Sequence, residues 1–243
     1  MFSFFKQVRK SSRPQCTALV AAAGASSRMG GINKLLEPLD GVPVLARTLT
    51  ALQLARQVDE IIVACREPDL LPVSDLCHTY GISKCSKVIR GGETRVHSVL
   101  LAALEADPAS QLLAVQDGAR PLVTPALIDR VISAAARCGA AAPAVPLKDT
   151  IKVVRVGGAV EKTLDRTMLR AVQTPQVFDA SLLKAALQGA LEQQLPITDD
   201  CSAVERLGKV VFLVEGEEEN LKITTPTDLL LAEAILQNRE ENL

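Results

Sequence analysis

Small residues and two cations are combined in one short segment near the N-terminus. An apolar run passes into a loop of Ala, Gly and Ser residues, and Arg28 and Lys34 follow it. Small side chains let backbone N–H groups approach a phosphate closely, and the cations meet its charge. The lysine is not followed by Ser or Thr, so the segment is not a P-loop. It predicts a nucleotide triphosphate site that includes Ala22, Ala23 and Gly24, with an ordinary strand-to-helix turn as the alternative.

A pair of glycines, Gly91 and Gly92, stands between a predicted strand and a predicted helix. Residues without a Cβ atom allow a ligand to approach the backbone closely. Arg95 and Ser98 follow in the first turns of the predicted helix. We expect Gly92, Arg95 and Ser98 to form a second wall of the nucleotide site, with a plain helix start as the alternative.

An aspartate ends another predicted strand. Asp117 follows the apolar run 112–115 and precedes Arg120 by three residues. Mg²⁺ is commonly bound by one or two carboxylates together with substrate phosphates and water. Asp117 is therefore predicted to be a Mg²⁺ ligand beside the triphosphate, and a helix-capping aspartate is the alternative. Arg120 is expected either to orient Asp117 or to bind the acceptor.

Apolar runs alternate with helical periods over the first 145 residues. The predicted strands are 17–22, 61–64, 86–89, 112–115 and 140–145, and the predicted helical faces are 44–52, 96–104 and 127–135. This alternation favours right-handed βαβ units and a mainly parallel sheet. We therefore expect an α/β protein with a Rossmann-like, three-layer architecture. Ligands of such sheets bind at the carboxyl ends of the strands, where the three motifs above all lie.

The alternating pattern breaks near Pro146. Residues 151–156 and 159–163 surround Gly157 and Gly158 and predict a β-hairpin. An isolated hairpin with few large apolar residues is not stable alone, so we expect an arm over 146–172 that packs on a second subunit of a homodimer. Residues 1–14 are expected to be a flexible tail, and 15–243 one domain. Further helices are predicted from Ser181, over 199–207 and after Pro226, with a strand at 210–214.

The composition sets limits on function. The 243 residues are 48% hydrophobic with a net charge of −1, and no dense Lys/Arg run occurs, so nucleic acid is not an expected partner. No apolar run approaches the length of a membrane span. The six cysteines include no Cys-x-x-Cys pair, and there are two histidines, which argues against zinc and for reduced, mostly buried thiols. We expect a cytoplasmic protein that does not bind a membrane.

Taken in order, the motifs resemble those of the 2-C-methyl-D-erythritol 4-phosphate cytidylyltransferase family. The resemblance covers about residues 16–236 and rests on the following segments: the 21–34 loop, Gly91-Gly92-x-x-Arg95-x-x-Ser98, Asp117-x-x-Arg120-Pro121, Asp149-Thr150-x-Lys152, Asp165-Arg166, Thr174-Pro175-Gln176, Thr198-Asp199 and Asn220-x-Lys222-x-Thr224. Gln116 departs from the family pattern, in which a histidine often precedes the aspartate.

The resemblance implies transfer of CMP from CTP to methylerythritol phosphate, with release of pyrophosphate, in isoprenoid precursor synthesis. Arg28, Lys34 and Lys222 would then be the catalytic cations, and Asp117 would position Mg²⁺. The arm would cross to the dimer mate, so that Thr150 and Arg166 hold the polyol phosphate in the neighbouring site. Thr174 and Thr198 would contact the acceptor in the chain's own site.

Two alternatives differ in substrate and in class. A ribitol-5-phosphate cytidylyltransferase would share the phosphate-binding motifs. A catalytically silent nucleotide-binding module would usually have lost a cation or the metal carboxylate, whereas this chain keeps Arg28, Lys34, Asp117 and Lys222 together.

Overall fold

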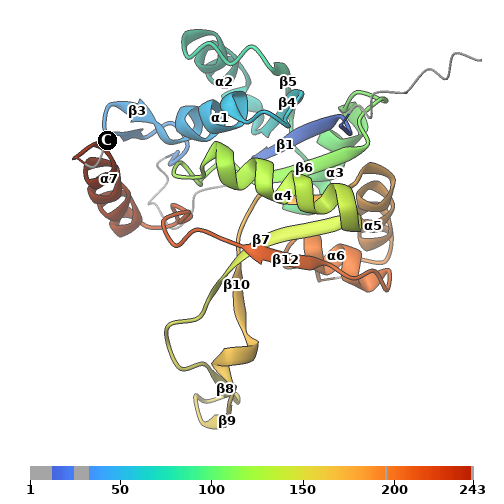
Figure 1. Cartoon of the computed structure of the whole chain (residues 1–243), viewed down its shortest axis with the longest axis vertical. Helices are drawn as coiled ribbons and strands as arrows, with labels where there is room; N and C mark the ends of the chain where they lie inside the picture. The colour runs from blue at the N-terminus through green and yellow to red at the C-terminus, as the bar shows by residue number, and fades with distance from the viewer. Residues whose placement is uncertain (1–12, 25–32, 195, 242–243) are drawn as a thin grey trace, which may run out of the picture.

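The computed structural model describes residues 13–24, 33–194 and 196–241. Most of its strands form one eight-stranded sheet (Figure 1). Seven of these strands follow the order β10-β7-β11-β6-β1-β4-β5, and the eighth, β12, also pairs with β7, along residues 141–144. The strands are β1 (Cys16–Ala22), β4 (Glu60–Cys65), β5 (Cys85–Arg90), β6 (Leu112–Asp117), β7 (Ala140–Pro146), β10 (Arg170–Val172), β11 (Gln176–Asp179) and β12 (Phe212–Glu215). Only β10 and β11 run antiparallel to their neighbours, so the predicted mainly parallel sheet is confirmed.

Helices cover both faces of the sheet, which confirms the three-layer architecture. One buried cluster joins the sheet to α1 (Val44–Leu54), α2 (Leu70–Thr79), α4 (Pro125–Cys138) and α7 (Pro226–Glu241). The other joins it to α3 (Arg95–Glu105), α5 (Ala180–Glu192) and α6 (Asp200–Arg206).

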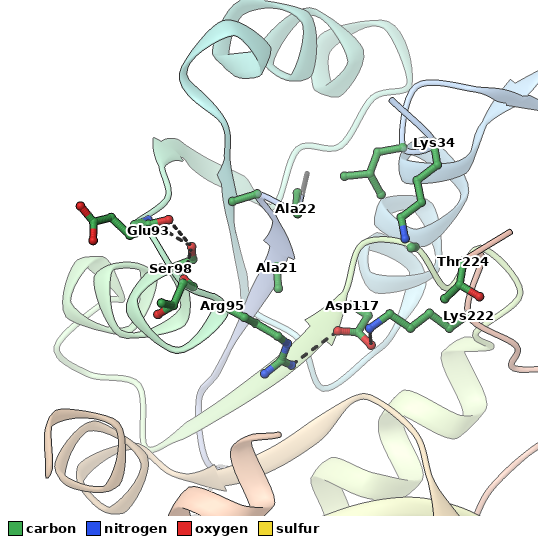
Figure 2. Close-up of a pocket in the computed structure, with 15 residues that line it drawn as sticks. Ala21, Ala22, Lys34, Glu93, Arg95, Ser98, Asp117, Lys222 and Thr224 are labelled. Carbon is green, nitrogen blue, oxygen red and sulfur yellow. Dashed lines mark hydrogen bonds and ion pairs between the residues drawn. The ribbon is translucent and has the colours of Figure 1, made fainter. Parts of the chain in front are cut away.

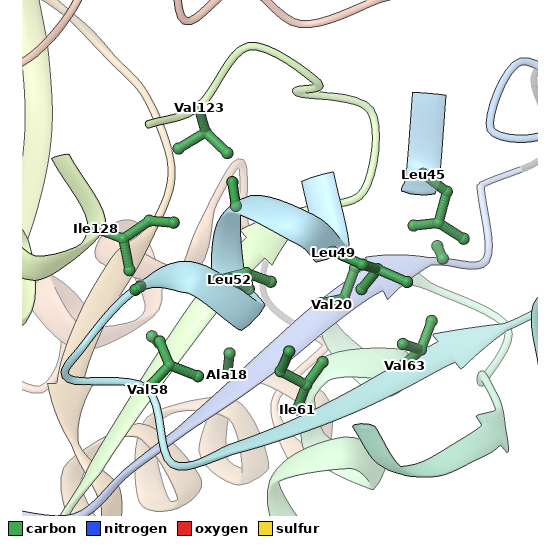
Figure 3. Close-up of a cluster of buried hydrophobic side chains, with 14 of the residues drawn as sticks. Ala18, Val20, Leu45, Leu49, Leu52, Val58, Ile61, Val63, Val123 and Ile128 are labelled. Carbon is green, nitrogen blue, oxygen red and sulfur yellow. The ribbon is translucent and has the colours of Figure 1, made fainter. Parts of the chain in front are cut away.

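The alternation of side chains along β1 shows how one strand serves both layers. Ala18 and Val20 belong to the cluster that contains Leu49 of α1, whereas Leu19 between them belongs to the cluster of α3 (Figure 3). Successive side chains of a strand point to opposite faces, and in this strand both faces are apolar because both are covered. The central strands are therefore held rigidly, with their carboxyl ends at one edge.

Two helices begin and end at residues suited to those positions. Thr94 caps α3 by accepting a hydrogen bond from the N–H of His97 at 3.1 Å. Thr124 caps α4 in the same way, and α4 is followed by Gly139 at φ +80°, a left-handed conformation that favours glycine.

The arm projects away from the sheet (Figure 1). It contains a two-stranded hairpin of β8 (Lys152–Val154) and β9 (Val160–Thr163), a short 3-10 turn η3 (Arg166–Met168), and β10, which returns to the edge of β7. Smaller elements elsewhere are the β2 (Pro38–Leu39) and β3 (Val42–Pro43) hairpin and the 3-10 turn η2 (Glu67–Asp69).

The structure adds elements that the sequence pattern did not predict. The helix α2 and the strands β10 and β11 were not expected, and β11 inserts between β6 and β7. The expected tail falls largely outside the described residues. At its end, Arg13 forms an ion pair of 2.6 Å with Asp59, which fixes this point of the chain beside β4.

Candidate functional site

A cavity of about 370 Å³ opens at the carboxyl ends of β1 and β6 (Figure 2). The residues around it come from the small-residue loop, the Gly91-Gly92 segment with the start of α3, the end of β6 and the segment before α7. They are Ala21, Ala22, Ala23, Gly24, Lys34, Leu35, Gly92, Glu93, Thr94, Arg95, Ser98, Asp117, Ala119, Lys222 and Thr224. The three motifs that the strand ends were expected to bring together therefore line one cavity.

The Gly92 wall is held by the Ser98 hydroxyl. Ser98 Oγ accepts a hydrogen bond from the Gly92 N–H at 3.1 Å and lies 2.9 Å from the carbonyl oxygen of Thr94, to which it donates. A Cβ atom at Gly92 would overlap the His97 ring and lie 2.7 Å from His97 Cβ. The backbone thus packs against α3 more closely than any other residue type allows, and the space left on the opposite side belongs to the cavity.

Gly92→Ala should therefore displace this wall. We expect KM for the nucleotide to rise about tenfold with a smaller change in kcat, because the added methyl group pushes the loop away from α3 and misplaces a binding surface. Steady-state kinetics with the nucleotide as the varied substrate measure this change. Gly189→Ala is the matched control, since a Cβ atom at this α5 position meets nothing within 4 Å. An unchanged KM in the Gly92 variant would show that the wall does not contact the nucleotide.

Asp117 is surrounded by three cations. Its Oδ2 lies 2.9 Å from Lys222 Nζ and 3.6 Å from Arg120 Nε, and its Oδ1 lies 3.5 Å from Arg95 Nη2. Burial alone would raise the pKa of this carboxyl, but Arg95, Lys222 and Arg120 outweigh it and hold the pKa below its ordinary value. Asp117 is therefore ionised at neutral pH, and its negative charge is shared by the three surrounding cations.

Arg95 has a second, closer partner that the sequence analysis missed. Its Nη2 lies 2.8 Å from Oδ2 of Asp200, whose side chain is completely buried at the start of α6. Burial raises the pKa of Asp200, and the facing guanidinium opposes that rise. Two adjacent aspartates at a helix start were the available signal: Asp199 caps α6, which leaves Asp200 to point inward.

Lys34 reaches the cavity from one side and Lys222 from another (Figure 2). Lys34 Nζ donates a hydrogen bond of 2.8 Å to the carbonyl oxygen of Ile223. The segment is fixed in turn by Asp228, whose Oδ2 accepts hydrogen bonds of 2.7 Å from both the N–H and the hydroxyl of Thr224. The cavity therefore has one lysine from each end of the chain, and the backbone of the later segment positions the earlier one.

Several predicted residues lie outside the cavity lining. Thr174 is buried, and its Oγ1 accepts a hydrogen bond of 3.1 Å from the Asp117 N–H. Arg120 Nη1 donates to the carbonyl oxygen of Asn220 at 2.5 Å, so Arg120 joins Asp117 to the segment that carries Lys222. Thr198 is exposed near the start of α6. Thr174 and Arg120 thus touch Asp117 directly, whereas Thr198 does not.

The remaining predicted residues belong to the arm or lie outside the described residues. Thr150 and Arg166 are exposed on the arm, and Arg166 Nη1 donates to the Lys148 carbonyl oxygen at 2.5 Å. Within this chain they are not brought to the cavity. Arg28 lies outside the described residues.

The cavity residues missed by the sequence analysis are mostly neighbours of predicted ones: Ala21, Leu35, Glu93, Thr94, Ala119 and Thr224. Fold and site together define a nucleotide-binding α/β protein, with small residues and clustered cations around a cavity at the strand ends. This arrangement is typical of a nucleotidyltransferase.

Comparisons with known proteins agree with that class. The family model of 2-C-methyl-D-erythritol 4-phosphate cytidylyltransferase matches residues 16–238. A protein of that name from Dehalococcoides mccartyi is 42% identical over 220 residues, covering 90% of this chain and 95% of the relative. The crystal structure of the Thermus thermophilus cytidylyltransferase is 36% identical, with a TM-score of 0.76 over 92% of this chain and 99% of that one. The Anaerococcus prevotii 4-diphosphocytidyl-2C-methyl-D-erythritol synthase is 31% identical, with a TM-score of 0.82 over 92% and 96% of the two chains.

The chain therefore belongs to the 2-C-methyl-D-erythritol 4-phosphate cytidylyltransferase family, as its motifs predicted. Among the described residues, no helix has both the length and the apolar character needed to cross a membrane.

Proposed function

We propose that this protein transfers the cytidylyl group of CTP to the phosphate of 2-C-methyl-D-erythritol 4-phosphate. An acceptor phosphate oxygen forms a bond to the α-phosphorus, and the bond from that phosphorus to the bridging oxygen breaks, so that pyrophosphate leaves with the electron pair. The observation that carries the proposal is the convergence of Lys34, Arg95 and Lys222 around one cavity beside Asp117. Family membership supplies the identity of the two substrates.

The reaction needs the stabilisation of negative charge rather than a general base. The second ionisation of a phosphate monoester lies near pH ~6, so the acceptor is already a nucleophilic anion at neutral pH. The obstacle is the approach of two anions and the charge that develops at the α-phosphorus. Lys34 stabilises that charge, Lys222 draws the α-phosphate and the acceptor together, and Arg28 meets the triphosphate. Backbone N–H groups approach the phosphates closely at four small residues: Ala22, Ala23, Gly24 and Gly92.

The residues present fit Mg²⁺ that enters together with the nucleotide. No group of three or more His, Cys, Asp or Glu side chains suited to holding a metal occurs among the described residues. A buried, ionised Asp117 beside a triphosphate is the donor set that Mg²⁺ favours, one carboxylate with phosphates and water. When bound there, Mg²⁺ would neutralise phosphate charge and orient the triphosphate. Asp117 is the residue that would hold it.

We further propose that the functional unit is a homodimer joined through the arm. The arm exposes several large apolar side chains, which argues for a surface that is covered in the assembled protein: Val154, Val156, Val160, Met168 and Val172. In the dimer, Thr150 and Arg166 reach the partner's cavity and bind the polyol phosphate, while Thr198 contacts the acceptor from the chain's own side. Thr174 acts there through Asp117.

A pyrophosphate-release assay with a panel of polyol phosphates tests the proposed reaction. With CTP and Mg²⁺, we expect turnover of methylerythritol phosphate and loss of turnover on addition of a chelator, restored by excess Mg²⁺. Turnover of ribitol 5-phosphate alone would overturn the acceptor. Binding of CTP without turnover of any acceptor would identify a silent nucleotide-binding module.

A further inference from the structure

Two cysteines outside the nucleotide cavity lie side by side at one turn. Cys77 is in the last turns of α2, and Cys85 is the first residue of β5, which packs beside α2 (Figure 1). The two thiols lie close enough for each to affect the pKa of the other. Cys85 Sγ also lies 3.7 Å from the Lys87 carbonyl oxygen.

The turn between them is held by the backbone. The Ile82 N–H donates to the Cys77 carbonyl oxygen at 2.9 Å, and the Gly81 N–H donates to the His78 carbonyl oxygen at 3.2 Å. With Gly81 at φ +64°, this is a Schellman ending of the helix. The Cys85 N–H then donates to the Ile82 carbonyl oxygen at 3.0 Å. Both cysteines are therefore fixed relative to the same residue, and their proximity is built into the turn.

Small molecules can reach this pair. Cys77 and Cys85 both line a surface cavity of about 670 Å³ between α2 and β5, distinct from the nucleotide cavity. Cys16, Cys65 and Cys201 are buried like Cys77 but line neither cavity, and burial raises the thiol pKa to about 12 at Cys16 and to about 11 at Cys65. Those thiols stay protonated and unreactive at neutral pH.

We propose that Cys77 and Cys85 form a redox modification site, which a small-molecule disulfide converts into an intramolecular disulfide. The Cys77 thiolate attacks one sulfur of the small disulfide and expels the first small thiolate. The Cys85 thiolate then attacks the Cys77 sulfur of the mixed disulfide and expels the second. Two protein thiols are oxidised, the small disulfide is reduced to two thiols, and the two protein protons end on the released thiolates.

The electrostatics of the pair divide these roles. The neighbouring Cys85 thiol lowers the pKa of Cys77 despite its burial, which favours Cys77 as the attacking thiolate. The Cys77 thiol in turn raises the pKa of Cys85, which keeps its proton until Cys77 has reacted. A neighbouring thiol that is still reduced at this stage attacks the mixed disulfide, so that the mixed disulfide does not accumulate.

The test treats the reduced, folded protein with oxidised glutathione, alkylates the remaining thiols in denaturant and maps the tryptic peptides. Trypsin cleaves after Lys84, between the two cysteines, so the disulfide joins peptide 67–84 to peptide 85–87. We expect this linked peptide to become the main oxidised product and to disappear after reduction. Cys138→Ser, at a part-buried cysteine on α4, is expected to give the same linked peptide.

The variant Cys85→Ser distinguishes the proposed sequence of steps. With the resolving thiol removed, Cys77 should keep its glutathione, and the modified peptide 67–84 should accumulate. Circular dichroism checks that the variant is folded. Full alkylation of Cys77 and Cys85 in the oxidant-treated wild type, or glutathione retained on both, would overturn the proposal. Scrambled pairing among all six cysteines in the folded protein would also overturn it.

Discussion

Replacing Asp117 by asparagine should lower the free energy of unfolding by about 3 kcal/mol and remove most of the activity, since it leaves buried cations without their shared anion. Arg95, Arg120 and Lys222 all face this carboxylate, and the amide that replaces it carries no charge. Urea denaturation measures the stability, and pyrophosphate release measures the activity. Asp59→Asn is the control, because it also breaks an ion pair, with Arg13 at 2.6 Å, but it lies outside the nucleotide cavity.

The pH dependence of that loss follows from the direction of the pKa shift. The folded-state pKa of Asp117 is lowered, so its contribution is fully present above the unfolded value of about 3.9 and is lost as the pH falls through the folded value. The stability difference between wild type and Asp117→Asn should therefore be constant from neutral pH to about pH 5 and shrink below pH ~4. A difference that grew toward acid pH would contradict the cation cluster as its source.

Lys34→Ala should lower kcat by about 10²–10³-fold with a smaller effect on KM, as expected for a cation whose main contact is with charge that develops in the transition state. Single-turnover pyrophosphate release measures this step. The matched control is Lys84→Ala, because Lys84 Nζ also donates to a backbone carbonyl, that of Ala55 at 2.7 Å, away from the cavity. Unchanged release in the Lys34 variant would remove this residue from the reaction.

The same variant also tests whether the active site is shared between subunits. Co-expression of Lys34→Ala with Arg166→Ala should restore part of the activity that each lacks alone. In a mixed dimer, one site carries both changes and the other carries neither, provided that Arg166 acts in the partner's cavity. Absence of any recovery in a mixed dimer confirmed by mass would place Arg166 in its own subunit's chemistry or outside the site.

The cavity could be predicted largely from sequence because its parts are local. Gly92, Ser98 and Asp117 each follow a strand with a clear apolar run, and the carboxyl ends of parallel strands meet at one edge. Spacing alone placed them on the same side of the sheet. Lys222 was found differently, through the resemblance of the Asn220-x-Lys222 motif to the family, since no strand end precedes it.

The parts that could not be predicted depend on pairing between distant segments. The strand β11 has four residues, and its place between β6 and β7 is fixed by partners far away in the chain. The two adjacent aspartates at the start of α6 could have marked Asp200 as pointing inward, but only the packing of α6 against α3 and α5 shows that its partner is Arg95. The contact between the Thr174 hydroxyl and the Asp117 N–H was not foreseen either, and the assignment of Thr174 to the acceptor stays a prediction.

The hydrogen bond from Lys34 to Ile223 joins residues 189 positions apart. During synthesis from the N-terminus, the first wall of the cavity leaves the ribosome long before the segment that positions its lysine. A chain interrupted before Ile223 would lack this hydrogen bond, since long-range contacts form only after the intervening chain is closed. Lys222 and Thr224 line the same cavity as residues 21–24, so we expect the nucleotide cavity to be completed only late in the synthesis of the chain.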